Sequence, residues 1–168
     1  MTEAPPKILV IDDDPYIVDV VSMSLKHIGG YEVITAQNGA DGIDLCMREQ
    51  PIAVVVDVGM PQLDGYQVVR ALRGDPETAD LPIIMLTARV QERDETIGTL
   101  SGADFYLKKP LNPWQLVQAI TNAISISHAD RRRRTLHMVD FVEDDSPTSP
   151  QPRVPPTPAN LPDEGGKG

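Results

Sequence analysis

Five polar side chains each follow a short apolar run, and their functional groups could act together if the fold brings them to one place. They are three carboxylates, a hydroxyl and an ammonium, from Asp12, Asp13, Asp57, Thr87 and Lys109. Carboxylates gathered together repel one another unless a cation lies between them, and an all-oxygen ligand set suits Mg²⁺ or Mn²⁺. Carboxylate, metal, hydroxyl and ammonium together supply what a phosphoryl group needs, a nucleophile and positive charge near its oxygens. Taken singly, Thr87 is typical of a strand end and Lys109 of a solvated surface.

The apolar runs lack polar alternation, which is typical of strands buried on both faces of a parallel sheet. Strands are therefore expected at 7–11, 31–36, 52–57, 83–87 and 105–108. Amphipathic spacing and capping residues predict helices at about 15–28, 40–49, 65–73, 90–100 and from 113 onward. Asp14 is interpreted as a helix cap. The expected fold class is α/β, a doubly wound, flavodoxin-like (βα)5 sheet with strand order 2-1-3-4-5, whose switch point would gather the acidic residues.

Composition divides the chain into two parts. A folded domain is expected at 7–128, followed at 129–168 by a basic and then proline-rich tail that is expected to be disordered. The net charge of −10 argues against general nucleic-acid binding. The single cysteine, Cys46, fits a reducing compartment and is expected to be a buried structural thiol. Without a signal-peptide pattern or an apolar run long enough to span a membrane, the chain is expected to be cytoplasmic.

The tail begins with four arginines at 131–134, for which three interpretations stay open. The first is a solvated basic extension of the last helix. The second is a docking contact with acidic surfaces of a partner or of the protein itself, and the third is binding to nucleic acid or a membrane surface. A short apolar cluster at 136–142 could serve as a docking peptide.

Five motifs occur in a fixed order along residues 7–128. They are Ile8-Leu9-Val10-Ile11-Asp12-Asp13, Asp57 with Met60-Pro61 and Asp64-Gly65, Thr87-Ala88, Gly102-Ala103-Asp104, and Lys109-Pro110. As an ordered set, they resemble the receiver domain of two-component response regulators. No single motif would be specific, but the set at these spacings is.

The resemblance implies a metal-dependent phosphoacceptor. Asp57 would accept a phosphoryl group from a phosphohistidine and become an aspartyl phosphate. Mg²⁺, or Mn²⁺, would be bound by Asp13, by Asp57 and by the main-chain carbonyl of Gly59, with Asp12 supporting the metal through water. The protein would not be an enzyme beyond its own phosphorylation and dephosphorylation.

The resemblance also implies a switch. Thr87 and Lys109 would contact the phosphoryl oxygens, and Tyr106 would be the aromatic residue that turns inward as Thr87 moves; a half-exposed strand tyrosine is the alternative for Tyr106. The expected phosphodonor is a sensor histidine kinase or a histidine phosphotransfer protein. Output would reach a downstream protein through the face formed by 90–100, 105–108 and the last helix, or would use a phosphorylation-dependent homodimer. About forty residues follow the receiver, too few and too rich in proline for a DNA-binding effector domain.

Besides a surface difference at Ile52, two departures from the family pattern lie near the expected site. Gly59 has no side chain to orient a hydrolytic water, and Arg89 adds a cation, so we hypothesise that Arg89 alters the lifetime of the phosphoryl group.

The residues leave three alternative functions. An aspartyl-phosphate phosphatase would need an aspartate in place of Gly59. A flavin-binding module would need a Ser, Thr and Gly loop where the chain has Asp12–Asp14. The remaining alternative is a phosphorylation-independent, receiver-like interaction module whose output lies in the C-terminal tail.

Overall fold

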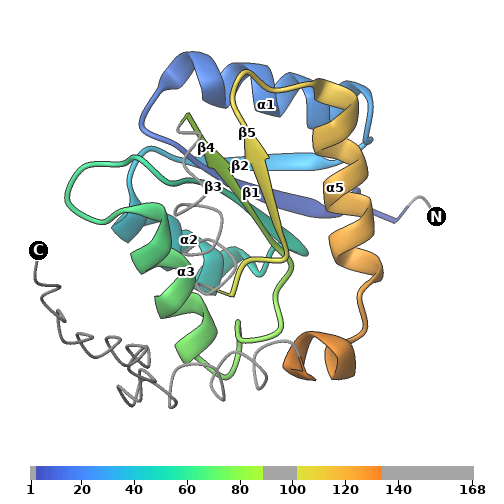
Figure 1. Ribbon diagram of the computed structural model, residues 1–168. Helices are drawn as coiled ribbons and strands as arrows, with labels where there is room; N and C mark the ends of the chain where they lie inside the picture. Colours follow the sequence, from blue (N-terminus) through green and yellow to red (C-terminus); the bar gives the residue numbers. More distant parts are fainter. Residues whose placement is uncertain (1–2, 89–101, 134–168) are drawn as a thin grey trace, which may run out of the picture.

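A single parallel sheet forms the centre of the protein. The computed structural model describes residues 3–88 and 102–133 (Figure 1). Within these ranges five strands pair in the order β2-β1-β3-β4-β5, all parallel. Their bounds are Lys7–Ile11 for β1, Glu32–Ala36 for β2, Ala53–Asp57 for β3, Ile83–Thr87 for β4 and Phe105–Lys108 for β5. The predicted fold class and strand order are confirmed.

Two layers of helices cover the sheet, α1 and α5 on one face and α2 and α3 on the other (Figure 1). The bounds are Pro15–His27 for α1, Gly39–Glu49 for α2, Gly65–Gly74 for α3 and Pro113–Ser125 for α5. Predicted boundaries differ from these by a residue or so. The helix predicted at 90–100 and the tail beyond 133 lie outside the described residues.

Each central strand sends alternate side chains into the two layers, as the two-residue period of a strand requires. In β3, Val55 joins the core beneath α1 and α5, while Val54 and Val56 join the core beneath α2 and α3. All five residues of β3 are buried. Burial on both faces therefore explains why this strand carries an unbroken apolar run up to Asp57.

Capping side chains fix where the helices begin near the C-terminal ends of the strands. The Asp14 carboxylate accepts a hydrogen bond from the Tyr16 amide at the start of α1, and the predicted cap is confirmed. Asn112 caps α5 in the same way, with Pro113 as its first residue. Asp64 begins α3 with a reciprocal capping box. These turns are consequently held in place next to the strand ends.

After α5 the chain folds back on the domain through a further helical stretch at 128–133. Arg131 is only 4% exposed. Its guanidinium donates to the Asp104 carboxylate at 2.9 Å and to the main-chain carbonyls of Asp80 and Ala123 at 2.7 and 2.6 Å. The interpretation of Arg131 as solvated is therefore wrong. A buried carboxylate needs a cation, and the planar guanidinium fork can satisfy it and two carbonyls at once.

The same carboxylate also binds a second arginine. The Asp104 side chain is 2% exposed and lies 3.3 Å from an amino nitrogen of Arg73 on α3. Arg132 is exposed and forms an ion pair with Asp80 at 3.0 Å. The docking interpretation, in its intramolecular form, thus fits Arg131 and Arg132, whereas the domain boundary at 128 stays a prediction. We call Asp104, Arg73 and Arg131 the Asp104 clamp.

None of the helices in the described ranges is both long enough and apolar enough to cross a membrane.

Cys46 is buried in α2, as predicted. Burial raises the pKa of the Cys46 thiol to about 11.

Candidate functional site

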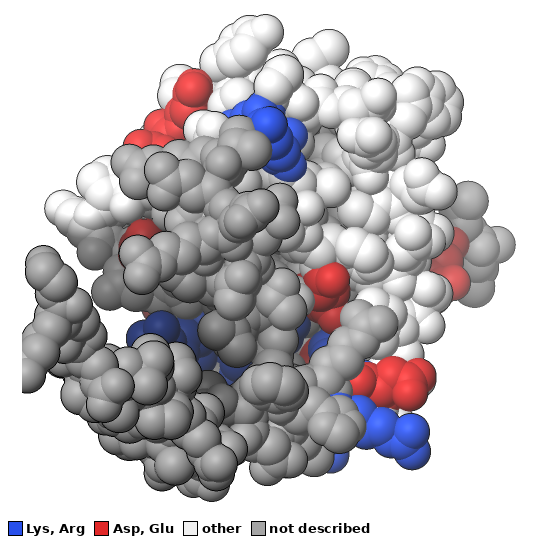
Figure 2. Space-filling view, in the orientation of Figure 1, with Lys and Arg blue, Asp and Glu red and all other residues white. Residues whose placement is uncertain are grey.

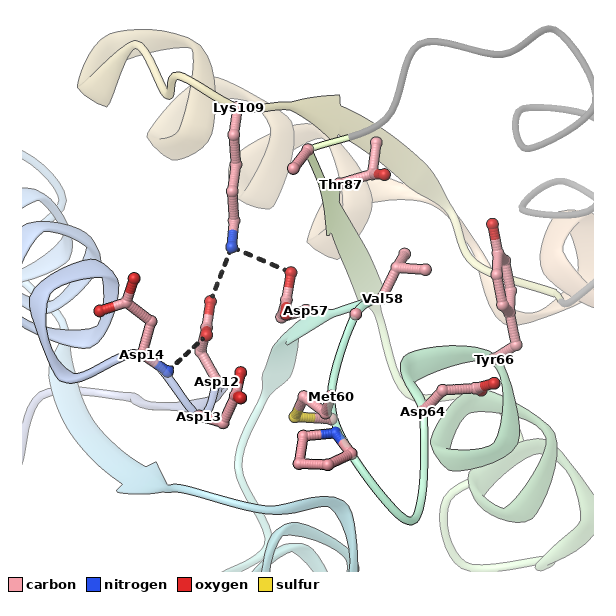
Figure 3. A pocket seen from close by; sticks show the side chains of 13 residues that line it. Asp12, Asp13, Asp14, Asp57, Val58, Met60, Asp64, Tyr66, Thr87 and Lys109 are labelled. Carbon is pink, nitrogen blue, oxygen red and sulfur yellow. Dashed lines mark hydrogen bonds and ion pairs between the residues drawn. The ribbon is translucent and has the colours of Figure 1, made fainter.

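Four strands, β1, β3, β4 and β5, deliver acidic, hydroxyl and basic groups to one pocket at the C-terminal edge of the sheet (Figure 3). The predicted site residues that line the pocket are Asp12, Asp13, Asp57, Thr87 and Lys109, together with Gly59. Ligands of doubly wound sheets bind at such an edge, at the switch point between neighbouring strands. The fold therefore brings all six of these residues together, as the sequence predicted.

Three carboxylates form the floor of the pocket. Oxygen atoms of Asp12, Asp13 and Asp57 all lie within 4.8 Å of one another. Asp12 and Asp57 are buried and Asp13 is exposed. The Asp12 carboxylate also accepts a hydrogen bond of 2.9 Å from the Asp14 amide. An exclusively oxygen donor set in so small a space is of the kind that binds Mg²⁺.

Lys109 provides the positive charge between the carboxylates (Figure 3). Its Nζ lies 3.0 Å from an Asp57 oxygen and 3.2 Å from an Asp12 oxygen. Burial alone would lower the pKa of Lys109, but the hydrogen bonds and charges of Asp57 and Asp12 together raise it above its usual value. The ammonium is thus charged throughout the neutral range and neutralises part of the acidic cluster.

The buried position of Asp12 affects its ionisation. Burial raises the pKa of Asp12, and the negative charge of Asp57 raises it further. The amide of Asp14 and the ammonium of Lys109 oppose this shift. A divalent cation at the cluster would favour the ionised form of Asp12 by the same electrostatic argument.

Thr87 is the last residue of β4 and is 3% exposed. Its carbonyl accepts a hydrogen bond of 2.7 Å from the Lys109 amide, which links the ends of β4 and β5. The Lys109–Pro110 peptide bond that follows is cis. The hydroxyl of Thr87 and the ammonium of Lys109 are therefore placed by two neighbouring, hydrogen-bonded strands. The predicted role of Thr87 as a phosphoryl contact stays a prediction.

Two glycines lie between β3 and the body of α3, and only Gly65 is closely packed. A Cβ at Gly65 would collide with main-chain atoms of Asp57 and Val58. By contrast, a Cβ at Gly59 would lie 3.8 Å from an Asp57 carboxylate oxygen, an ordinary contact distance. Position 59 thus faces the site and has room for a side chain. This is consistent with the interpretation that Gly59, which has none, departs from the family pattern.

Tyr106 has a partner that sequence reasoning did not identify. Its hydroxyl lies 2.9 Å from the hydroxyl of Tyr66, which itself lines the pocket. Tyr66 follows the Asp64-Gly65 motif directly, and this adjacency was the available signal. The pairing itself joins positions 40 residues apart, which no local pattern reveals. Arg89 lies outside the described residues.

Comparison with known proteins places most of the folded part of the chain in one family. The response regulator receiver domain matches residues 8–121. Over 119 residues the chain is 40% identical to protein PilH of Pseudomonas aeruginosa, covering 70% of this chain and 96% of PilH. It is 43% identical to RpaA of Synechocystis, described as a DNA-binding dual master transcriptional regulator, over 68% of this chain and 47% of RpaA. The aligned region thus spans about half the length of RpaA.

The chain also resembles solved receiver structures. The receiver domain of the sensor histidine kinase PA1611 from Pseudomonas aeruginosa superposes with a TM-score of 0.68 and 28% identity, covering 73% of this chain and 100% of that one. That structure is described with a magnesium ion coordinated in its active-site cleft. The chain therefore belongs to the response regulator receiver domain family of two-component signalling systems. Its acidic cluster fits the metal site of a receiver.

Proposed function

We propose that the protein is a response regulator whose on-signal is a phosphoryl group on Asp57, received from a sensor histidine kinase or a histidine phosphotransfer protein. The observation that carries the proposal is the Lys109 ammonium, held between the carboxylates of Asp57 and Asp12 at the C-terminal edge of the sheet. A carboxylate beside a partly buried cation and two further carboxylates is an arrangement suited to phosphoryl transfer.

The chemistry follows from the residues that line the pocket. An Asp57 carboxylate oxygen attacks the phosphorus of phosphohistidine, the bond from phosphorus to nitrogen breaks, and its electron pair leaves with the imidazole. Lys109 stabilises the negative charge on the phosphoryl oxygens, because its Nζ already lies 3.0 Å from Asp57. Thr87 stands at the neighbouring strand end, where its hydroxyl can bind another of these oxygens.

The carboxylate cluster fits a divalent cation. Asp12, Asp13 and Asp57, with the main-chain carbonyl of Gly59, offer only oxygen ligands, which is the preference of Mg²⁺ and is met by Mn²⁺ as well. When bound, such a cation offsets the repulsion between phosphoryl oxygens and carboxylates. Asp13, Asp57 and the Gly59 carbonyl would hold the metal, with Asp12 in support through water, and Asp57 would also accept the phosphoryl group.

Output runs through the face that includes β5 and α5. Phosphorylation adds about −1.5 to −2 charges at Asp57, and new contacts to Thr87 and Lys109 favour a second arrangement of β4 and β5. The α5 sequence contains no charged residue, and Figure 2 shows an uncharged surface there, with Trp114 70% exposed. This surface suits contact with a downstream protein or with a second copy of the chain.

The test combines mass spectrometry with one isosteric substitution. A small phosphodonor with Mg²⁺ should add one phosphate to the wild type and none to Asp57→Asn. Asp14→Asn is the matched control, because asparagine also caps helices and Asp14 is outside the carboxylate cluster. Equal phosphate uptake by wild type and Asp57→Asn would refute the assignment. A pull-down that recovers the same partners with phosphorylated wild type and Asp57→Asn would favour the phosphorylation-independent module instead.

A further inference from the structure

Two tyrosine hydroxyls meet beside the candidate site, and one of them has no role in the function proposed above. The hydroxyl oxygens of Tyr66 and Tyr106 lie 2.9 Å apart in a partly buried position, and either can be the donor. Tyr66 is the second residue of α3 and Tyr106 the second residue of β5. One hydrogen bond therefore joins the helix that follows Asp57 to the strand that precedes Lys109.

Tyr66 is held at a nearly fixed place relative to Asp57. The Gly65 amide donates to the Val58 carbonyl at 3.0 Å, and the Val58 amide donates to the Leu86 carbonyl at 2.8 Å. Gly65 also packs so closely on the Asp57 main chain that a Cβ would not fit. A displacement of Asp57 and its loop must consequently move the start of α3 and the Tyr66 ring with it.

Tyr66 extends from the acidic pocket to Tyr106. It lines the pocket together with Asp57 and Thr87, and its ring rises from the start of α3 on the Thr87 side (Figure 3). Tyr106 lies opposite Met85 in the sheet, and both tyrosines pack against the core beneath α2 and α3. The Tyr106 ring is thus directed toward α3 in this structure.

The hydroxyl pair is strong enough to matter for a two-state ring. A hydrogen bond of this kind changes the ratio of two conformers by roughly 2- to 12-fold. When the populations of two conformers differ by a factor in this range, one added phosphoryl group can readily reverse their ratio. A Tyr66→Phe variant keeps the aromatic ring in this core and removes only the hydroxyl, so it separates the contribution of the hydrogen bond from that of packing.

We propose that Tyr66 is a positioning residue for Tyr106. Its hydroxyl holds the Tyr106 ring on the side of β5 that faces α3 and transmits movements of the loop at Asp57 to that strand. This inference rests on the proposed function, because it assigns Tyr66 to the path between phosphorylation and the output face.

The test uses the full-length chain with ring-¹³C tyrosine, whose four tyrosines give a spectrum that single Tyr→Phe variants can assign. Wild type, Tyr66→Phe and the control Tyr31→Phe are compared by NMR before and after a small phosphodonor with Mg²⁺. Tyr31 packs in the opposite core, beneath α1 and α5. Phosphate content is measured by mass on the same samples.

We expect the Tyr106 signal of the unphosphorylated protein to shift in Tyr66→Phe and to stay in place in Tyr31→Phe. At equal phosphate content, the response of Tyr106 to phosphorylation should fall by roughly 2- to 12-fold in Tyr66→Phe. Normal phosphate uptake with an unchanged Tyr106 signal and response in Tyr66→Phe would overturn this inference alone. A wild type that takes up no phosphate would overturn the proposed function, whatever the ring signals show.

Discussion

Lys109 is the residue on which the charge balance of the acidic pocket depends. It is the cation that lies within 3.2 Å of both Asp12 and Asp57, two carboxylates that are otherwise buried beside each other. The adjacent residue, Lys108, is exposed and serves as a matched control. The sequence could mark Lys109 as the functional lysine only through the motif with Pro110, since the two lysines are chemically identical.

We predict that Lys109→Met lowers the free energy of unfolding by about 1–3 kcal/mol in the absence of divalent metal, because two buried carboxylates lose their counter-ion. Mg²⁺ should restore much of this stability, as it replaces the missing positive charge. Urea unfolding with and without Mg²⁺ measures both effects. Lys108→Met should behave as wild type, and a metal-free Lys109→Met of wild-type stability would contradict the prediction.

Cys46 offers a second prediction, on pH dependence. Because burial raises its pKa from 9.0 to about 11, the thiolate fraction at pH 8 should be about 100-fold lower than in the unfolded chain. Alkylation by iodoacetamide should therefore be slow in the native protein and fast in urea.

The raised pKa of Cys46 also makes the stability of the fold depend on pH. Its contribution to the free energy of unfolding is fully present below pH 9 and is lost as pH rises toward 11. A Cys46→Ala variant should lack this pH-dependent part of the stability. Equal alkylation rates in the native and the unfolded protein would contradict a raised pKa of the Cys46 thiol.

At the scale of elements, the loop from β3 to α3 connects Asp57 to the helix that carries Tyr66. Gly65 and Gly74 are the first and last residues of α3 and form a natural comparison. A Cβ at Gly65 would overlap the main chain of Asp57 and Val58, whereas a Cβ at Gly74 would meet nothing within 4 Å. Close main-chain packing therefore requires glycine at position 65, whereas no neighbouring atom requires it at position 74.

We predict that Gly65→Ala destabilises the protein by about 1–3 kcal/mol, because main-chain atoms cannot move aside as a flexible side chain can. It should also slow phosphate uptake by displacing Asp57. Gly74→Ala should leave both unchanged or stabilise the fold by up to about 1 kcal/mol, since alanine restricts the unfolded chain. Thermal unfolding and phosphate uptake are the measurements, and equal effects at the two positions would refute the argument.

The elements themselves were predictable because their signals are local. Apolar runs without alternation marked the strands, and Asp14 with Pro15 and Asn112 with Pro113 marked two helix starts. The strand ends then gathered the site residues, since parallel strands end at a shared edge. The contact between Tyr66 and Tyr106 was not predictable in this way, because it depends on how α3 lies across the sheet.

For the whole molecule, the Asp104 clamp joins distant parts of the chain at the edge of the sheet opposite the candidate site. Asp104 accepts hydrogen bonds from the Ile83 amide at the start of β4, from Arg73 on α3 and from Arg131 beyond α5. Burial lowers the pKa of Arg73, and the charge of Asp104 opposes that shift. The arginine run at 131–134 was predicted to be exposed to water, because runs of charged residues usually lie on the surface. Its first member is buried because it binds Asp104, 27 positions earlier, and two main-chain carbonyls, partners that no local pattern reveals.

We predict that Arg131→Met lowers the free energy of unfolding by about 2–4 kcal/mol. Breaking a buried ion pair typically costs about 3–5 kcal/mol, and here Asp104 keeps Arg73 as a partner. Arg132→Met is the matched control and should have no measurable effect, since its side chain is 73% exposed. The double variant Arg131→Met with Asp104→Asn should lose less than the sum of the two single losses, because both act on one interaction.

The clamp also predicts where the chain can be shortened. A protein that ends at Ser127 lacks Arg131 and should lose as much stability as Arg131→Met, whereas one that ends at Arg133 keeps every contact of the clamp described above. Urea unfolding of the two truncated proteins compares them directly. If both are as stable as the full-length chain, residues 128–133 are not part of the folded unit, and the boundary at 128 that the composition predicts is the correct one. If only the shorter protein is destabilised, the folded unit continues through Arg131.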